Sequence, residues 1–146
     1  MNMKLLLFLL LGLVSASIGC AKSEMSNSTK INNTLATPGN PVVSKSGKYQ
    51  LIVEESKEDG VAKQSFIIKN ISNETIYSSI EKFRIRDTLY FLWDEEDRVW
   101  VYSGDVGTYI WTQINERSWN KQSFSEMKGV LNPPEQLKKL KPHYFN

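Results

Sequence analysis

The stretch FRIRDTLYFLWDEEDRVWVYSGDVGTYIWTQI, residues 83–114, decides the fold. It contains three runs rich in aromatic and β-branched residues, separated by two short runs of acidic residues or glycine. Runs of this composition, bounded by such residues, are typical of antiparallel strands joined by tight turns. We therefore predict a three-stranded meander, with strands at residues 83–93, 98–103 and 108–114 and turns at 94–97 and 104–107.

The two turns determine which side chains of the meander face one another. We centre the first turn on Glu95 and Glu96 and give the second turn four residues, which places most aromatic side chains on one face. The predicted pairs are Phe91 with Trp100 and Leu89 with Tyr102 across the first turn, and Trp100 with Trp111 and Tyr102 with Tyr109 across the second. The other face is mostly aliphatic, so the middle strand is expected to be apolar on both sides.

This aromatic face is the candidate binding surface of the sequence. Its residues are Phe91, Trp100, Tyr102, Tyr109 and Trp111. Tryptophan and tyrosine offer large rigid surfaces with a polar group, which suits sugars, peptides or a protein partner. The alternative, which the composition favours, is a core packed on another hairpin or on the C-terminal segment, because buried aromatic side chains dominate cores.

A second hairpin precedes the meander. Residues 49–55 alternate apolar and polar side chains, Asp59 and Gly60 form a two-residue turn, and residues 61–69 return. Closure on this turn pairs Val53 with Phe66 and Leu51 with Ile68 on one apolar face. A turn at 70–74 and a short strand at 75–80 follow. These elements predict a mainly β fold, a small antiparallel sandwich or partly open barrel with a short C-terminal helix.

The C-terminal part contains one ambiguous segment and one helix. Within residues 116–128, Trp119, Phe124 and Met127 are placed to pack back on the sheet. Further on, Asn132 is a candidate cap and Pro133 a candidate first helical residue, while Pro142 ends the pattern. The weak apolar edge of this segment predicts a short surface helix.

Composition excludes several classes of function. The chain has 146 residues, a net charge of +2, one cysteine and one histidine. The small charge disfavours nucleic-acid binding, and one cysteine with one histidine disfavours disulfide frameworks, metal sites and most Ser-His or Cys-His nucleophiles. No catalytic or phosphate-binding motif is present, so we expect a non-catalytic protein without a metal or cofactor.

The N-terminus carries an export signal. A charged start at residues 1–4 precedes ten apolar or glycine residues at 5–14, and small residues follow up to Gly19. The apolar run is shorter than the about 20 residues of a membrane-spanning helix. The only cysteine, Cys20, comes directly after this segment.

The sequence Ser17-Ile18-Gly19-Cys20 resembles the lipobox of bacterial lipoproteins, although a branched apolar residue is usual where Ser17 stands. The resemblance implies that Cys20 is acylated and becomes the first residue of the mature chain. Lys22, in place of an aspartate, favours the outer membrane. An ordinary secretory signal is the alternative, as is a eukaryotic secreted protein with glycosylation sequons at Asn27, Asn32, Asn70 and Asn73.

We divide the chain into a signal peptide at 1–19, a lipidated cysteine with a flexible tether at 20–47, and one β-rich domain at 48–146. Of the 27 residues at 21–47, 16 are Ser, Thr, Asn, Pro or Gly, a composition typical of disorder. An ordered first strand through Pro41, Val42 and Val43 is the alternative.

Two charged features are weaker candidates for sites. The acidic turn 94–97 has the carboxylates for calcium, but it lacks the glycine and the ligand spacing of an EF-hand loop, which favours a solvated turn. Arg84 and Arg86 are spaced to hold an anion, but charge on an exposed strand edge explains them too.

We therefore expect a cell-envelope lipoprotein that binds a protein, for example as an inhibitor or immunity protein. Ser103 and Gly104, with Tyr109, are similar to the Ser-Gly loop of membrane-bound lysozyme inhibitors. An assembly subunit is the alternative, and a small carbohydrate-binding or hydrolytic protein a further one. An inhibitor should present a protruding polar loop at 104–107, and a subunit a bare strand edge or exposed aromatic face.

Overall fold

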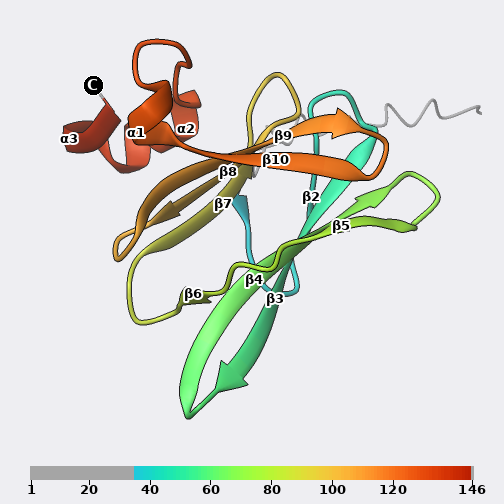
Figure 1. Ribbon diagram of the computed structural model, residues 1–146, viewed down its shortest axis with the longest axis horizontal. Helices are drawn as coiled ribbons and strands as arrows, with labels where there is room; N and C mark the ends of the chain where they lie inside the picture. Colours follow the sequence, from blue (N-terminus) through green and yellow to red (C-terminus); the bar gives the residue numbers. More distant parts are fainter. Residues whose placement is uncertain (1–34, 146) are drawn as a thin grey trace, which may run out of the picture. The chain divides into compact units, whose positions relative to one another are not determined.

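Two antiparallel sheets pack as a sandwich in the computed structural model, which describes residues 35–145 (Figure 1). The first sheet has strand order β1-β7-β8-β9-β10, and the second has order β2-β3-β4-β5, with the short β6 also paired to β4. The strands are β1 Leu35–Ala36, β2 Val42–Val43, β3 Tyr49–Glu58, β4 Val61–Asn70, β5 Thr75–Ser78, β6 Phe83–Arg84, β7 Leu89–Trp93, β8 Val99–Ser103, β9 Gly107–Asn115 and β10 Ser118–Ser123. The predicted fold class is thus confirmed in its sandwich form.

The β3–β4 hairpin has the predicted register. Leu51 pairs with Ile68 and Val53 with Phe66, and these four side chains are buried in the core between the sheets. Asp59 and Gly60 both have positive φ, 50° and 80°, as a two-residue turn with right-handed strand twist requires.

The predicted register of the meander is wrong by one residue at each turn. Trp93 pairs with Val99, and the N–H of Asp94 donates to the carbonyl of Arg98 over 3.0 Å. The turn therefore has three residues, 95–97, and Asp97 at its end has a φ of 58°. At the other turn Ser103 pairs with Gly107, so three residues rather than four separate the strands. Because of these shifts, each side chain of the middle strand β8 shares a face with different side chains of β7 and β9 than predicted.

The aromatic side chains consequently lie on both faces of the first sheet. Phe91 is opposite Val101 and Trp100 is opposite Leu92, instead of facing each other. Phe91, Tyr109 and Trp111 belong to the core between the sheets, whereas Trp100 and Tyr102 belong to a second core on the outer face. The predicted grouping of the five residues on one face is therefore wrong, while β8 is apolar and buried on both sides as expected.

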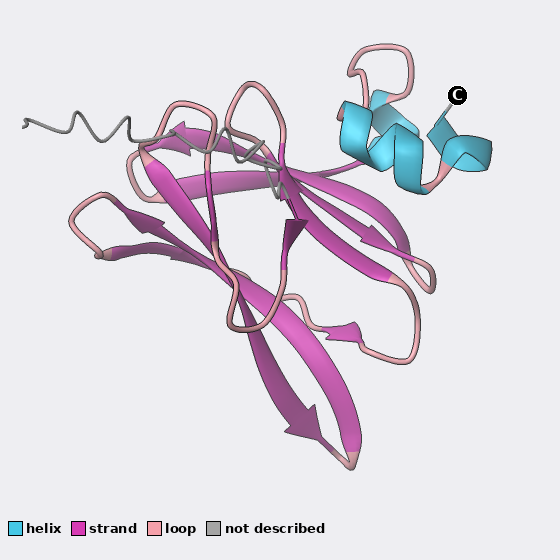
Figure 2. Cartoon of the chain, turned by 180° about the vertical axis from the view of Figure 1, so that it is seen from behind, coloured by secondary structure: helices cyan, strands magenta, loops and turns pink. Residues whose placement is uncertain are grey.

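Three short helices lie at one end of the first sheet and pack on its outer face there (Figure 2). They are α1 Phe124–Met127, α2 Glu135–Leu140 and α3 Pro142–Phe145. Leu137 of α2 is fully buried on Trp100 and Tyr102, together with Phe124, Met127 and others. The expected packing on the sheet is confirmed for Phe124 and Met127, whereas Trp119 is itself part of strand β10 and lies in the core between the sheets.

The predicted start of the C-terminal helix is wrong, whereas its predicted end before Pro142 is confirmed. The N-cap of α2 is Pro134 rather than Asn132, and no side chain caps it. Helix α2 ends at Leu140, and Pro142 begins the separate helix α3, because the first turn of a helix tolerates a residue without an N–H. The buried Leu137 also makes α2 part of a core and not merely a surface helix.

Residues 35–47 are part of the sandwich and not of a flexible tether. Strand β1 pairs with β7 in the first sheet and β2 with β3 in the second, so this segment passes from one sheet to the other. Ala36 is buried in the core, and the indole Nε1 of Trp93 donates to the carbonyl of Val42 over 2.9 Å. The alternative of an ordered strand through Val42 and Val43 is thus the observed one. The predicted signal peptide, Cys20 and the rest of the tether lie outside the described residues.

The predicted strand 83–93 is interrupted. Its first two residues form β6, which pairs with β4 of the second sheet, and its last five form β7 of the first. The chain therefore changes sheets between Arg84 and Leu89. No helix of the described segment 35–145 is long and apolar enough to cross a membrane.

We expect Leu137→Ala to lower the free energy of unfolding by about 2–5 kcal/mol, because it leaves a cavity between α2 and β8. Lys139→Ala, on the exposed side of the same helix, should change it by less than about 0.5 kcal/mol. Urea unfolding of the full chain, followed by tryptophan fluorescence, measures both values. Equal midpoints for the two variants would show that α2 is not part of the folded unit.

Candidate functional site

Asp94 organises the turn between β7 and β8. Its side chain is only 5% exposed, and its Oδ1 accepts hydrogen bonds from the backbone N–H groups of Glu96 and Arg98, both over 2.9 Å. Its Oδ2 accepts from the Nε of Arg98 over 2.5 Å and from the Nε1 of buried Trp100 over 2.8 Å. The carboxylate therefore ties the turn to the core on the outer face of β8.

The other carboxylates of this turn point to separate partners. Glu95 forms an ion pair with Lys45 at 3.2 Å, and Glu96 pairs with Arg98 at 2.9 Å. Asp97 accepts a hydrogen bond from the backbone N–H of Ser46 over 3.0 Å. In the described part of the chain no three acidic, histidine or cysteine side chains gather as metal ligands. The turn is solvated only at Glu95 and Glu96, since Asp94 is a structural acceptor.

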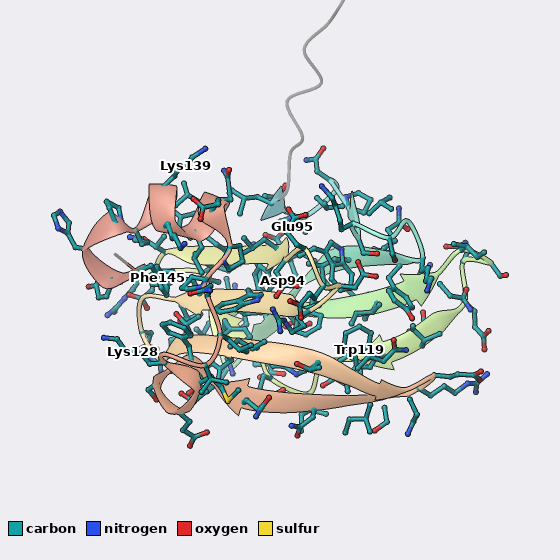
Figure 3. The ribbon with its side chains drawn as sticks, turned by 90° about the horizontal axis from the view of Figure 1, so that it is seen from above. Asp94, Glu95, Trp119, Lys128, Lys139 and Phe145 are labelled. Atoms are coloured by element: carbon teal, nitrogen blue, oxygen red, sulfur yellow. The ribbon has the colours of Figure 1, made fainter. Side chains whose placement is uncertain are left out.

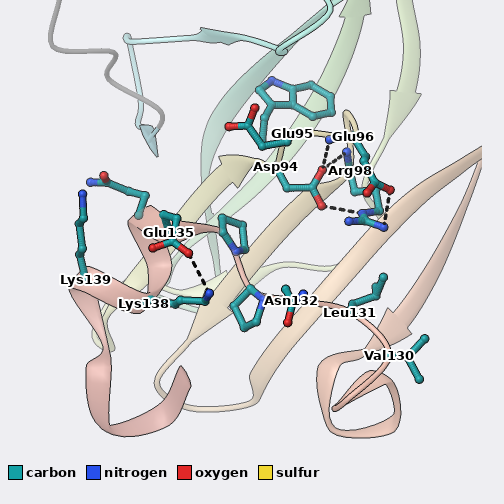
Figure 4. A pocket seen from close by; sticks show the side chains of 14 residues that line it. Asp94, Glu95, Glu96, Arg98, Val130, Leu131, Asn132, Glu135, Lys138 and Lys139 are labelled. Carbon is teal, nitrogen blue, oxygen red and sulfur yellow. Dashed lines mark hydrogen bonds and ion pairs between the residues drawn. The ribbon is translucent and has the colours of Figure 1, made fainter. Parts of the chain in front are cut away.

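A groove of about 620 Å³ lies between this turn and residues 130–139 (Figure 4). One wall holds Asp94, Glu95 and Glu96, and the other holds Pro133, Pro134 and the start of α2. Within this second wall, Glu135 forms an ion pair with Lys138 of the same helix at 2.8 Å. Most charged groups of the groove thus neutralise one another, so the groove presents no strong field to a charged ligand.

The five predicted aromatic site residues are held by contacts inside the protein. Trp100 packs on Phe124 with ring centroids 5.4 Å apart, and Tyr102 lies edge-on to Phe145 at 6.1 Å. On the other face, Trp111 donates to the hydroxyl of Tyr77 over 3.0 Å. Figure 3 shows Phe145 at the helical end of the molecule and Trp119 far from it, toward the other end of the sheet.

Tyr109 and Trp111 lie beneath a basic side chain. The ammonium group of Lys121 lies 4.3 Å from the centroid of the Tyr109 ring and 5.7 Å from that of Trp111. Lys121 also forms an ion pair with Glu81 at 2.8 Å, which joins the edges of the two sheets. The aromatic residues therefore form two cores and no single exposed platform.

The turn at 104–107 is closed by hydrogen bonds of its own. The N–H of Gly104 donates to the carbonyl of Thr88 over 2.9 Å, and the N–H groups of Asp105 and Val106 donate to the hydroxyl of Ser103. Val106 is about half exposed. The turn does not present the set of unpaired polar groups expected of an inhibitory loop.

The two arginines proposed to hold an anion belong to different segments of the chain. Arg84 is in β6 opposite Lys63, and Arg86 is in the loop before β7. Both are exposed, and neither forms an ion pair with an acidic residue between 35 and 145. The structure gives them no common ligand.

The outer half of the β3–β4 hairpin projects from the sandwich (Figure 1). Beyond Val53 and Phe66, which are core residues, the next residues toward the tip are mostly exposed. Strand β2 pairs only with Gln50 and Leu51 of β3, so the edge of β3 from Val53 to Glu58 has no neighbouring strand. A bare strand edge is a surface on which another chain can add a strand.

Sequence reasoning missed this surface because it ended the strand at Glu55. The observed strand continues through Ser56, Lys57 and Glu58. The signal was present in the turn: a two-residue turn at Asp59 and Gly60 requires Glu58 and Val61 to pair directly.

A charge cluster lies on the outer part of the hairpin. Glu58 forms ion pairs with Lys63 at 2.7 Å and with Lys82. Hydrogen bonds from the two lysines, of which that from Lys63 has the larger effect and that from Lys82 the smaller, lower the pKa of Glu58 from 4.5 to about 2. The cluster therefore carries one carboxylate and two ammonium groups at neutral pH. Ser56 lies opposite Lys63, and its Oγ is buried with no hydrogen-bond partner in the described chain.

Comparison with known proteins gave no relative: no family model, no curated protein and no solved structure matches the chain.

We expect Asp94→Ala to lower the free energy of unfolding by about 3–5 kcal/mol, because it leaves Arg98 and the indole of Trp100 buried without their acceptor. Glu95→Ala, at an exposed position of the same turn, should cost less than about 1 kcal/mol. Urea unfolding curves of the full-length variants provide the comparison. If both variants unfold together with the unaltered chain, Asp94 does not hold the turn.

We expect Glu58 to titrate at a pH of about 2 in the folded chain, in contrast to 4.5 for an ordinary glutamate. Since the folded pKa is lowered, the stabilisation by this carboxylate is complete above pH 4.5 and is lost as the pH falls toward 2. Lys63→Met should move the pKa of Glu58 back toward 4.5. Carboxyl NMR titration measures it, and Lys57→Met, which removes a neighbouring lysine outside the cluster, should leave it unchanged.

Proposed function

We propose that this protein is a lipid-anchored, non-catalytic component of the cell envelope that binds another polypeptide through the projecting β3–β4 hairpin. One observation carries the proposal. Beyond Val53, the last core residue of the strand, the edge of β3 from Glu54 to Glu58 is unpaired and lies outside the core. Strand addition to such an edge supplies main-chain hydrogen bonds, and the side chains beside it supply specificity.

The hairpin is a better contact element than the other candidates. The aromatic residues of the meander are occupied in two cores, and the turn at 104–107 satisfies its own backbone donors. The hairpin combines exposure with a rigid base, because Leu51, Val53, Phe66 and Ile68 fix its inner half in the core. A rigid projecting strand loses little conformational entropy when it binds.

The bare edge favours an assembly subunit over an inhibitor of a hydrolase. An inhibitor would fill a cleft with a loop, and the expected loop at 104–107 is short and internally bonded. A strand edge instead extends a sheet from one chain into the next. We therefore propose an assembly role, with membrane attachment at Cys20 and the outer membrane as its site.

We expect Cys20→Ser to abolish incorporation of a labelled fatty acid and to move the protein from the membrane fraction to the soluble fraction. Two or more acyl chains give stable membrane attachment, and the variant has no other acylation site, since Cys20 is the only cysteine. Mass spectrometry of the mature N-terminus provides the readout, with Ser17→Ala as a control that retains the cysteine. An unmodified Cys20 in the exported chain would contradict the anchor.

We expect a photo-reactive amino acid at Lys57 to form a discrete covalent adduct in intact envelopes, while the same amino acid at Lys139 on α2 forms none. Both side chains are exposed, so the comparison isolates the location of the contact. Mass spectrometry identifies the second polypeptide of the adduct. An adduct at Lys139 alone would move the contact away from the hairpin.

A further inference from the structure

We propose that the occupant of the free β3 edge is a second copy of this chain, paired antiparallel about Ser56 in a two-fold symmetric dimer. This inference rests on the proposed function in placing the contact on the hairpin. It adds the identity of the partner and the register of the pairing, and both follow from the direction of backbone groups and the order of charges along β3.

The backbone of β3 presents alternate residues to the free edge. Tyr49 accepts a hydrogen bond at its carbonyl from the N–H of Ser44 over 2.8 Å, so its groups point toward β2. No bulge interrupts the β3–β4 pairing, and alternation therefore continues along the strand. The residues whose N–H and C=O groups point outward at the bare edge are Val53, Glu55 and Lys57.

The hairpin turn supports the same assignment independently. In a two-residue hairpin, the residues that flank the turn form a pair that exchanges hydrogen bonds, here Glu58 and Val61. Even-numbered residues of β3 thus bond to β4. Odd-numbered residues beyond the reach of β2 have no strand to bond to.

This alternation restricts self-pairing to a few registers, because outward residues must face outward residues. A register centred on Glu55 places that carboxylate against its own copy. A register centred on Lys57 places two lysines together and Glu55 against Asp59. A register centred on Ser56 places Glu55 of each copy opposite Lys57 of the other, which gives two pairs of opposite charge.

On the other face of the pairing, two lysines offset the approach of one carboxylate to another. In the register centred on Ser56, Glu54 of one copy is opposite Glu58 of the other. Glu58 is bound by Lys63 and Lys82, so Glu54 meets a cluster with an excess of one positive charge. Glu54 itself is exposed and makes no ion pair among the described residues.

The size of the contact indicates a weak dimer that depends on confinement. Each copy contributes only one short exposed segment with few apolar side chains, far from the interface area of a stable free dimer. Attachment of both copies to one membrane raises their effective concentration and compensates for low intrinsic affinity. Charges at the edge meanwhile disfavour pairing in the other registers.

Cysteine scanning of the full chain in intact envelopes tests the register. In the proposed dimer the two Ser56 residues form a non-hydrogen-bonded pair with Cα atoms about 4.5 Å apart, within the roughly 4.4–6.8 Å that a disulfide spans. We expect Ser56→Cys to give a disulfide-linked dimer under oxidation. Glu54→Cys should give none, because its two copies lie about 13 Å apart along the strands.

The unaltered chain is the control for Cys20, because a dimer in that lane would come from the native thiol. A dimer with Glu55→Cys or Lys57→Cys in place of Ser56→Cys would overturn the register. If no cysteine at 54–58 links two copies while the photo-reactive group at Lys57 captures a different protein, the second-copy proposal is wrong and the hairpin function stands. If neither experiment gives an adduct, both are wrong.

A charge exchange tests the same pairing without a cysteine. Lys57→Glu and Glu55→Lys each convert two attractive pairs into repulsive ones, and we expect each to lower the association constant of the full chain anchored in lipid vesicles about tenfold. The double variant restores opposite charges and should restore association. Energy transfer between fluorescently labelled copies in the vesicles measures it, and failure of the double variant to recover while both single variants lose association would overturn the pairing of Glu55 with Lys57.

Discussion

Burial of strand β8 on both faces is the constraint on which the rest of the structure depends. All five of its residues are buried. Val99 and Val101 belong to the core between the sheets, whereas Trp100 and Tyr102 belong to the core under the C-terminal helices. A strand in this position cannot shift by one residue without exchanging the two sets of side chains. The length of each turn that flanks β8 is therefore fixed. The C-terminal segment must also return to cover the outer side chains, Trp100 and Tyr102, and Leu137 is its most buried contact with them.

Asp94 is the residue that turns this constraint into a defined register. A turn of two residues and one of three are both compatible with the acidic sequence, and they place Trp100 on opposite faces of the sheet. The carboxylate of Asp94 accepts from two backbone N–H groups of the longer turn and from the indole of Trp100 at the same time. Only the longer turn, with Asp97 at positive φ, offers this arrangement. The buried carboxylate is thus part of the fold rather than a ligand for a metal ion.

The sequence predicted the sandwich and the β3–β4 register because both depend on local signals. Asp59-Gly60 permits one turn geometry, and the alternation around Leu51 and Phe66 agrees with it. The meander was harder, because the length of its turns depends on contacts of Asp94 and Ser103 that composition does not reveal. The polar segment at 35–47 was misjudged for a similar reason. Ala36 and Val42 are ordered by strands that lie far away in the sequence, so their own composition carries no sign of it.

The edge of β3 is free where the strand extends beyond the buried part of the sandwich. The core fixes β3 as far as Val53, and beyond that point the strand is held by pairing with β4, by the turn at Asp59 and Gly60, and by the ion pairs of Glu58. Side chains there are not selected for packing, so their charges can serve recognition. A purely protective edge needs only charge, in any order. In the order found here, Glu55 and Lys57 share one face, and Glu58 on the other face is paired with two lysines. This order is self-complementary about Ser56. That symmetry distinguishes a surface for a second copy from an edge that merely avoids contact.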